Sequence, residues 1–67
     1  MTEAEIRSSL LNYAEQHNIG ATQLAGRVGS ADEEHRRTML RFLGGDSIAL
    51  EILALYAAFA ANLPPAS

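Results

Sequence analysis

Apolar positions along the chain fall into four groups, which glycine, asparagine and proline residues separate. The first group repeats at intervals of three and four, the spacing of one helix face: Ile6, Leu10, Tyr13 and Ala14. Thr2 and Glu5 stand three positions apart, as the two members of a capping box do. Asn18 and Gly20 are stop signals, so the pattern predicts a helix over about residues 3–17.

The second group predicts a short helix over about residues 21–28. Its apolar residues occupy the i, i+3, i+4 and i+7 positions of a single face: Ala21, Leu24, Ala25 and Val28. A helix of about eight residues is unstable alone in water, so this one depends on packing against the rest of the chain. Gly29 ends it.

The third group predicts a helix over about residues 31–43, ended by the glycine pair 44–45. Ser30 and Glu33 have the spacing of a second capping box. The acidic residues 32–34 lie in the first turn, where the helix dipole favours negative charge. The apolar residues of this helix form one inward stripe: Met39, Phe42 and Leu43.

The fourth group predicts a helix over about residues 47–62, which Asp46 or Ser47 caps and Pro64-Pro65 stops. Its nearly apolar run, residues 48–61, is 14 residues long and is interrupted by one glutamate. This run is shorter than the roughly 20 residues that a membrane-spanning helix needs.

Together the four helices predict an all-α, four-helix fold that occupies residues 1–67 as a single domain. A chain of 67 residues without cysteine depends on a very apolar core or on a second chain for its stability. Hydrophobic residues make up 48% of the chain, which fits either source of stability. The polar, acidic N-terminus is the opposite of a secretion signal, so we expect a cytoplasmic protein with no membrane partner.

Motifs for chemical catalysis are sparse in the chain. His17 and His35 stand 18 positions apart without any cysteine, so we interpret them as polar surface residues rather than as zinc ligands. The serines at positions 8, 9 and 30 lack a nearby base of the kind that a nucleophile requires. We therefore expect no enzyme activity, no metal, no cofactor and no small-molecule ligand.

The third predicted helix carries a cationic face. Arg37 and Arg41 lie opposite its apolar stripe on a helical wheel. Glu34 and Thr38 lie alongside them, and Arg36 lies at the boundary. The chain has a net charge of −3, so this local positive face favours an anionic polymer while the rest of the body is repelled. The alternative is that the acids at positions 32–33 pair with arginines four positions on, as on many solvated helices.

Two segments in the middle of the chain carry a family-like pattern. Residues 18–29 contain an aliphatic residue, a polar stretch, Leu24-Ala25 and a final Val28-Gly29. Residues 38–45 read Thr-Met-Leu-Arg-Phe-Leu-Gly-Gly. In this order the two segments resemble the brace helix and the recognition helix of small helix-turn-helix repressors of the Cro and lambda-repressor type, the XRE-type family. The resemblance spans about residues 5–61 and implies that the recognition helix enters the major groove of double-stranded DNA.

The resemblance also implies which side chains meet DNA. Arginine forms two hydrogen bonds to the O6 and N7 atoms of guanine, and threonine contacts a base edge or a thymine methyl group. Side chains at the start of the brace helix contact phosphate in this family. The residues implied for DNA contact are Thr22, Gln23, Arg36, Arg37, Thr38 and Arg41.

One spacing departs from the family pattern. Gly29 and Thr38 are nine positions apart, about four more than the helix-turn-helix family usually has. Either the turn is an enlarged loop, or the recognition helix is extended at its N-terminus. The second arrangement brings the acidic residues 32–34 toward the DNA backbone, which moves the expected base contacts to Arg37 and Arg41. It also leaves room for the acids to mask the arginines until a partner displaces them.

The fourth predicted helix is apolar on almost every side. A helix that is hydrophobic all round is buried all round, and a monomer of this size cannot bury it. We therefore expect a homodimer in which two recognition helices read half-sites one helical turn apart, about 34 Å. The residues expected between the two protomers are Leu50, Leu55, Phe59 and Leu63.

These observations lead to one functional hypothesis and one alternative. The first is a homodimeric transcriptional repressor that binds an inverted repeat in double-stranded DNA and autoregulates an operon of a phage or other mobile element. The alternative is a helical protein–protein interaction module, such as an antitoxin or an inhibitor, with a helix-turn-helix shape and no DNA affinity. The net charge of −3 favours this alternative.

Overall fold

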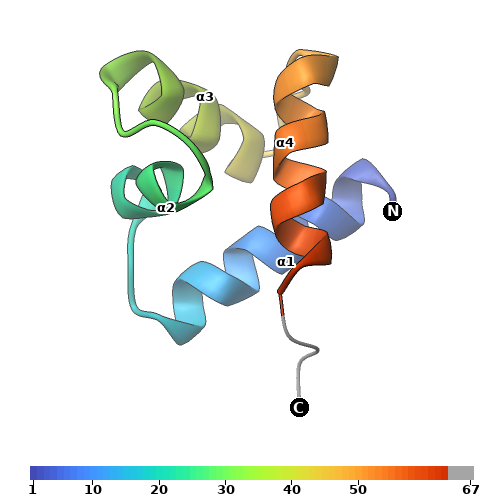
Figure 1. Cartoon of the computed structure of the whole chain (residues 1–67), viewed down its shortest axis with the longest axis horizontal. Coiled ribbons are helices and arrows are strands. Elements are labelled where there is room, and N and C mark those ends of the chain that lie inside the picture. Colours follow the sequence, from blue (N-terminus) through green and yellow to red (C-terminus); the bar gives the residue numbers. More distant parts are fainter. Residues whose placement is uncertain (64–67) are drawn as a thin grey trace.

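The computed structural model describes residues 1–63 and contains four α-helices within that range, joined by short connections (Figure 1). The helices are α1 (Glu3–Gln16), α2 (Ala21–Val28), α3 (Glu33–Leu43) and α4 (Leu50–Ala61). This arrangement confirms the predicted all-α, four-helix fold. The predicted stop at Pro64-Pro65 lies outside the described residues. None of the helices within residues 1–63 is long and apolar enough to cross a membrane.

One core joins all four helices. Helix α2 packs against α3, and α1 packs against α4. Figure 1 shows α2 and α3 together on one side of the molecule and α4 upright on the other. The buried residues come from every helix: Ile6, Leu10, Leu24, Ala25, Val28, Met39, Phe42, Tyr56 and Ala60. Because the short α2 contributes three of these residues, it is held by packing, as its length predicts.

The predicted capping box at the start of α1 is confirmed. The backbone N–H of Glu5 donates to the hydroxyl of Thr2 at 3.2 Å, and the N–H of Thr2 donates to the Glu5 carboxylate at 3.1 Å. Hydrogen bonding to Thr2 lowers the pKa of Glu5. The bond from the Thr2 backbone has the larger effect, and the Thr2 hydroxyl has the smaller one. The two reciprocal bonds satisfy amide groups that a helix otherwise leaves free.

One of the two predicted stop residues after α1, and one of the two after α3, adopts a left-handed backbone conformation. Asn18 has φ 53°, and Gly45 has φ 110°. Beyond α3, the N–H of Asp46 reaches back to the carbonyl of Arg41 at 2.9 Å, which completes a Schellman-type end. Glycine adopts this backbone conformation at no steric cost, so a glycine at position 45 favours the end of α3 at this point.

The start of α3 differs from the prediction. The helix begins at Glu33 rather than near residue 31, and its cap is Asp32, whose carboxylate accepts the N–H of His35 at 2.7 Å. The expected box of Ser30 and Glu33 is therefore wrong. The Ser30 hydroxyl instead donates to the Asp32 carboxylate at 2.8 Å. Two hydrogen bonds lower the pKa of Asp32. The bond from the His35 N–H has the larger effect, and the bond from the Ser30 hydroxyl has the smaller one.

The start of α4 also differs. The helix begins at Leu50 after Ala49, which makes no side-chain cap bond. The two predicted caps, Asp46 and Ser47, belong to the six-residue connection 44–49. Ser47 donates its hydroxyl to Glu3 at 3.3 Å, so it binds α1 instead of capping α4.

Arg7 of α1 clamps the end of α3. Its guanidinium donates to the backbone carbonyls of Phe42 and Asp46 and pairs with Glu3 at 3.1 Å. The same group lies over the Phe42 ring, with its central carbon 4.7 Å from the ring centre. Only 19% of the Arg7 side chain is exposed. Arg7 thus fixes the C-terminal end of α3 to α1.

A second polar link joins α4 to the start of α3. The hydroxyl of the buried Tyr56 lies 2.9 Å from Nε2 of His35, and Nδ1 of His35 lies 2.6 Å from the carbonyl of Ser30. Because a carbonyl only accepts, these partners assign the proton to Nδ1 and make Nε2 the acceptor of the Tyr56 hydroxyl. His35 is half-buried, so the interpretation of it as a polar surface residue is only partly right. His17 is exposed at the end of α1, as predicted.

The clamp of Arg7 predicts a stability effect. Replacing Arg7 by alanine removes charge-assisted bonds to two carbonyls, so we expect R7A to lose about 2 kcal/mol in the free energy of unfolding. The matched control is R37A, because Arg37 is paired only at the surface and its loss costs at most about 0.5 kcal/mol. Urea denaturation followed by circular dichroism measures both values. Equal losses in the two variants contradict the role assigned to Arg7.

The burial of Tyr56 predicts a loss of stability in alkali. Burial raises the pKa of Tyr56 from 10.0 to about 12. Because the pKa is higher in the folded state than in the unfolded state, the protonated Tyr56 hydroxyl contributes to the free energy of unfolding. This contribution is complete below pH 10 and is lost as the pH rises toward 12. We expect the midpoint of urea unfolding to fall over this interval in the wild type and to fall less in Y56F. Parallel curves for the two proteins contradict the prediction.

Candidate nucleic-acid interface

The position of α3 follows from the turn that precedes it. Residues 29–32 join α2 to α3, and a turn of this length is typical of helix-turn-helix motifs. A side chain at Gly29 would begin 3.3 Å from both the His35 ring and Leu55, so the close approach at this turn favours glycine. Met39 and Phe42 are fully buried on the inner side of α3. The opposite side of the helix therefore faces solvent.

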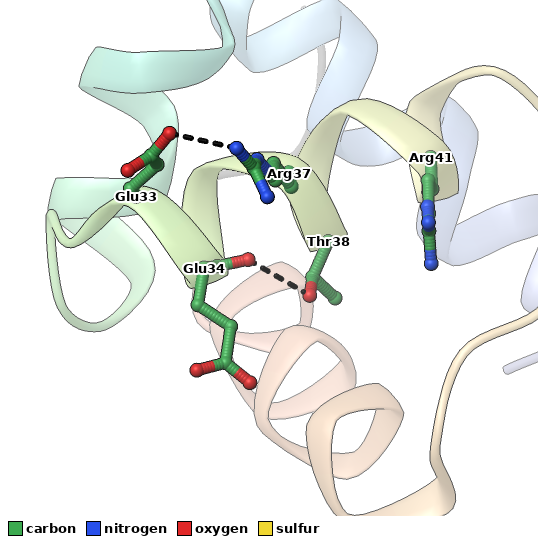
Figure 2. Close-up of a pocket in the computed structure, with 5 residues that line it drawn as sticks. All are labelled: Glu33, Glu34, Arg37, Thr38 and Arg41. Atoms are coloured by element: carbon green, nitrogen blue, oxygen red, sulfur yellow. Dashed lines mark hydrogen bonds and ion pairs between the residues drawn. The ribbon is translucent and has the colours of Figure 1, made fainter.

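Five residues form what we call the outer face of α3: Glu33, Glu34, Arg37, Thr38 and Arg41 (Figure 2). The structure thus brings together three of the residues implied for DNA contact: Arg37, Thr38 and Arg41. Arg36 is half-buried at the edge of this face, as the helical wheel predicts. Thr22 and Gln23 are exposed in the first turn of α2.

One ion pair lies within the outer face. The carboxylate of Glu33 and the guanidinium of Arg37 are 2.8 Å apart, and each side chain is 68% exposed. This confirms one of the two pairs that the spacing allows. The other, between Asp32 and Arg36, does not form, because the Asp32 carboxylate caps α3. An exposed pair is worth little, so another anion can displace Glu33 from Arg37.

The remaining groups of the outer face are open to a partner. The Thr38 hydroxyl donates to the backbone carbonyl of Glu34 at 3.1 Å, which leaves its oxygen lone pairs and its methyl group available. Glu34 and Arg41 are exposed, and within residues 1–63 neither forms an ion pair. Figure 2 shows the Glu34 carboxylate directed away from α3.

The other two arginines serve the fold. Arg7 forms the clamp described above, and Arg27 donates to the Tyr13 hydroxyl at 2.9 Å. Sequence reasoning did not identify either partner. The arginine of α2 and its tyrosine lie 14 positions apart, and no local pattern connects them. Arg37 and Arg41, on the outer face of α3, are exposed, and within residues 1–63 neither bonds to another helix.

The structure decides between the two explanations of the additional residues before Thr38. The turn has only four residues, 29–32, so it is not an enlarged loop. The additional residues lie in the first turn of α3, which carries Glu33 and Glu34. Helix α3 is thus the extended element, and two carboxylates share its outer face with the arginines.

The exposed side of α4 is apolar except for Glu51. Leu50 is 80% exposed and Leu55 is 45% exposed, whereas Phe59 and Leu63 are half-buried. The ring of Phe59 packs edge-on against Tyr13 of its own chain, with centres 5.3 Å apart. We call the exposed residues Leu50, Glu51, Ala54, Leu55, Ala58 and Ala61 the outer face of α4. Of the residues expected between protomers, Leu50 and Leu55 are the most open to a partner.

Comparisons with protein-family models, with curated proteins and with solved structures gave no match to this chain. Within residues 1–63 no group of three histidine, aspartate or glutamate side chains is placed to hold a metal ion. The functional argument therefore rests on the geometry of α3 and α4.

Proposed function

We propose that this protein is a transcriptional repressor that reads double-stranded DNA through the outer face of α3. The observation that supports the proposal is that the exposed Arg37 and Arg41 and the half-buried Thr38 lie together on one side of a helix whose opposite side is buried. A recognition helix must project in this way to enter the major groove. Arginine and threonine are also residue types that contact base edges there.

The charge distribution supports contact with an anionic polymer. Three of the five arginines lie within residues 36–41, although the chain carries a net charge of −3. Phosphate groups compete with the Glu33 carboxylate for Arg37, and the exposed pair yields at small cost. Thr22 and Gln23 are exposed at the start of α2, and we expect them to donate hydrogen bonds to phosphate oxygens. We expect binding that weakens steeply between about 50 and 200 mM salt.

The proposed repressor is a homodimer that pairs through the outer face of α4. Leu50 and Leu55 are the large apolar side chains of this face, Glu51 is its one charged residue, and Ala54, Ala58 and Ala61 form an alanine strip along it. Small residues let two helices approach closely, so a leucine of one protomer fits against the alanine strip of the other. Such a dimer occupies an inverted repeat with half-sites about 34 Å apart and blocks access of polymerase to an operon that includes its own gene.

A second candidate function is a protein–protein interaction module without DNA affinity. The observation that favours it is the presence of Glu33 and Glu34 on the same face as the arginines, which makes this face nearly neutral. A partner protein with mixed charges also complements such a face. If the folded wild-type protein binds no duplex at any salt concentration, it is an interaction module and not a repressor.

The repressor proposal predicts the effect of removing one arginine. On the preferred duplex, selected by the wild-type protein from a random library, R41Q should lose about 1–3 kcal/mol of binding free energy, because Arg41 makes a base contact. The matched control is R27Q, which removes the same charge from α2, where Arg27 binds Tyr13. Fluorescence anisotropy measures both affinities. Equal losses for the two variants indicate attraction by overall charge alone and contradict a base contact.

The dimer proposal predicts a change of mass in solution. We expect the wild type to sediment at twice the 7.2 kDa of one chain. L50D should sediment as a monomer, because an aspartate buried against the alanine strip of the partner helix loses its hydration without gaining a hydrogen bond. The control is L11D, which places the same charge at a 43% exposed leucine of α1. A monomeric wild type, or dissociation by L11D alone, contradicts pairing through α4.

A further inference from the structure

The inference concerns Glu34, the acidic residue of the outer face that has no ion-pair partner within residues 1–63. The carboxylate of its neighbour Glu33 forms an ion pair with the guanidinium of Arg37 at 2.8 Å. Glu34, Thr38 and Arg41 stand at i, i+4 and i+7, and Figure 2 shows these three side chains on the same side of α3. An unpaired carboxylate therefore lies in line with two of the residues assigned to DNA contact.

A carboxylate at this place is repelled by the phosphates of DNA unless it meets a hydrogen-bond donor. The helix dipole accounts for acidic residues in the first turn of α3, and Asp32 and Glu33 already serve that turn as its cap and its ion pair. Among the base edges in the major groove, the exocyclic amine of cytosine is the donor that glutamate side chains accept from. The Glu34 carboxylate matches that donor.

We propose that Glu34 is a specificity-determining residue, which accepts a hydrogen bond from N4 of a cytosine while Arg41 binds a guanine further along the same groove. This inference rests on the proposed function of the outer face of α3. It assigns a substrate class to that face: duplexes whose half-site contains two G·C pairs at a fixed spacing.

The helix geometry sets that spacing. Seven residues of α-helix rise about 10 Å, and successive base pairs are about 3.4 Å apart. The bases met by Glu34 and Arg41 are therefore about three base-pair steps apart. Thr38 lies between the two residues and presents its methyl group to the intervening pairs, where thymine methyl groups are its natural partners.

The charge of Glu34 also acts against incorrect sequences. On a duplex without the matching cytosine, the carboxylate faces acceptor atoms and phosphates, and it loses its hydration without gaining a bond. Discrimination thus comes partly from repulsion of wrong sites. A glutamine keeps the shape but not the charge, so it is the variant that separates these two effects.

The test is a selection from a random duplex library with the wild type, E34Q and the control E33Q. For the wild type we expect a recovered half-site with a cytosine and a guanine about three steps apart. Exchange of that cytosine should weaken wild-type binding about tenfold and E34Q binding less than about threefold. E34Q should also bind unrelated duplexes more tightly than the wild type, because a repulsive charge is lost.

E33Q loses the same charge one residue away and should keep the cytosine preference. Because Thr38 donates to the backbone carbonyl of Glu34, the substitution leaves that bond intact, and E34A provides a second variant if E34Q is poorly folded. An unchanged cytosine preference in folded E34Q and E34A overturns the role of Glu34 but leaves the repressor proposal standing. Failure of the wild type to recover any duplex overturns both.

Discussion

The burial of one side of α3 fixes the rotation of this helix about its axis. Met39 and Phe42 are fully buried, and Phe42 also packs edge-on against Tyr56 of α4, with ring centres 5.3 Å apart. The guanidinium of Arg7 covers the Phe42 ring and binds its carbonyl, so the end of the helix cannot turn without losing both contacts. The outer face of α3, and any function assigned to it, depends on this anchorage.

The sequence predicts the features that depend on neighbouring residues. The four helices, the capping box of Thr2 and Glu5, and the burial of Met39 and Phe42 all follow from spacings of three and four. The spacing of Ser30 and Glu33 predicts a cap at Ser30, and this prediction is wrong. The structure selects Asp32, whose side chain reaches the His35 N–H once residue 32 takes an extended backbone.

Contacts between residues far apart in the chain could not be predicted in this way. Arg7 binds the carbonyl of a residue 35 positions away, and His35 binds a tyrosine 21 positions away. Arginine and histidine are polar residue types that are usually found at the surface. Arg7 and His35 acquire their partners only when the helices pack together. In the candidate site, periodicity placed Arg37, Thr38 and Arg41 on one face correctly. It left open whether the acids there were paired, and the structure shows that one is.

Chemical protection of guanine tests the central claim most directly, because dimethyl sulfate methylates N7 in the major groove. A duplex enriched from a random library is treated with the reagent, with and without saturating protein. Insertion of α3 predicts protection of guanine N7 in two clusters about one helical turn apart. Unchanged methylation at saturation, or protection confined to adenine N3 in the minor groove, contradicts major-groove recognition by α3.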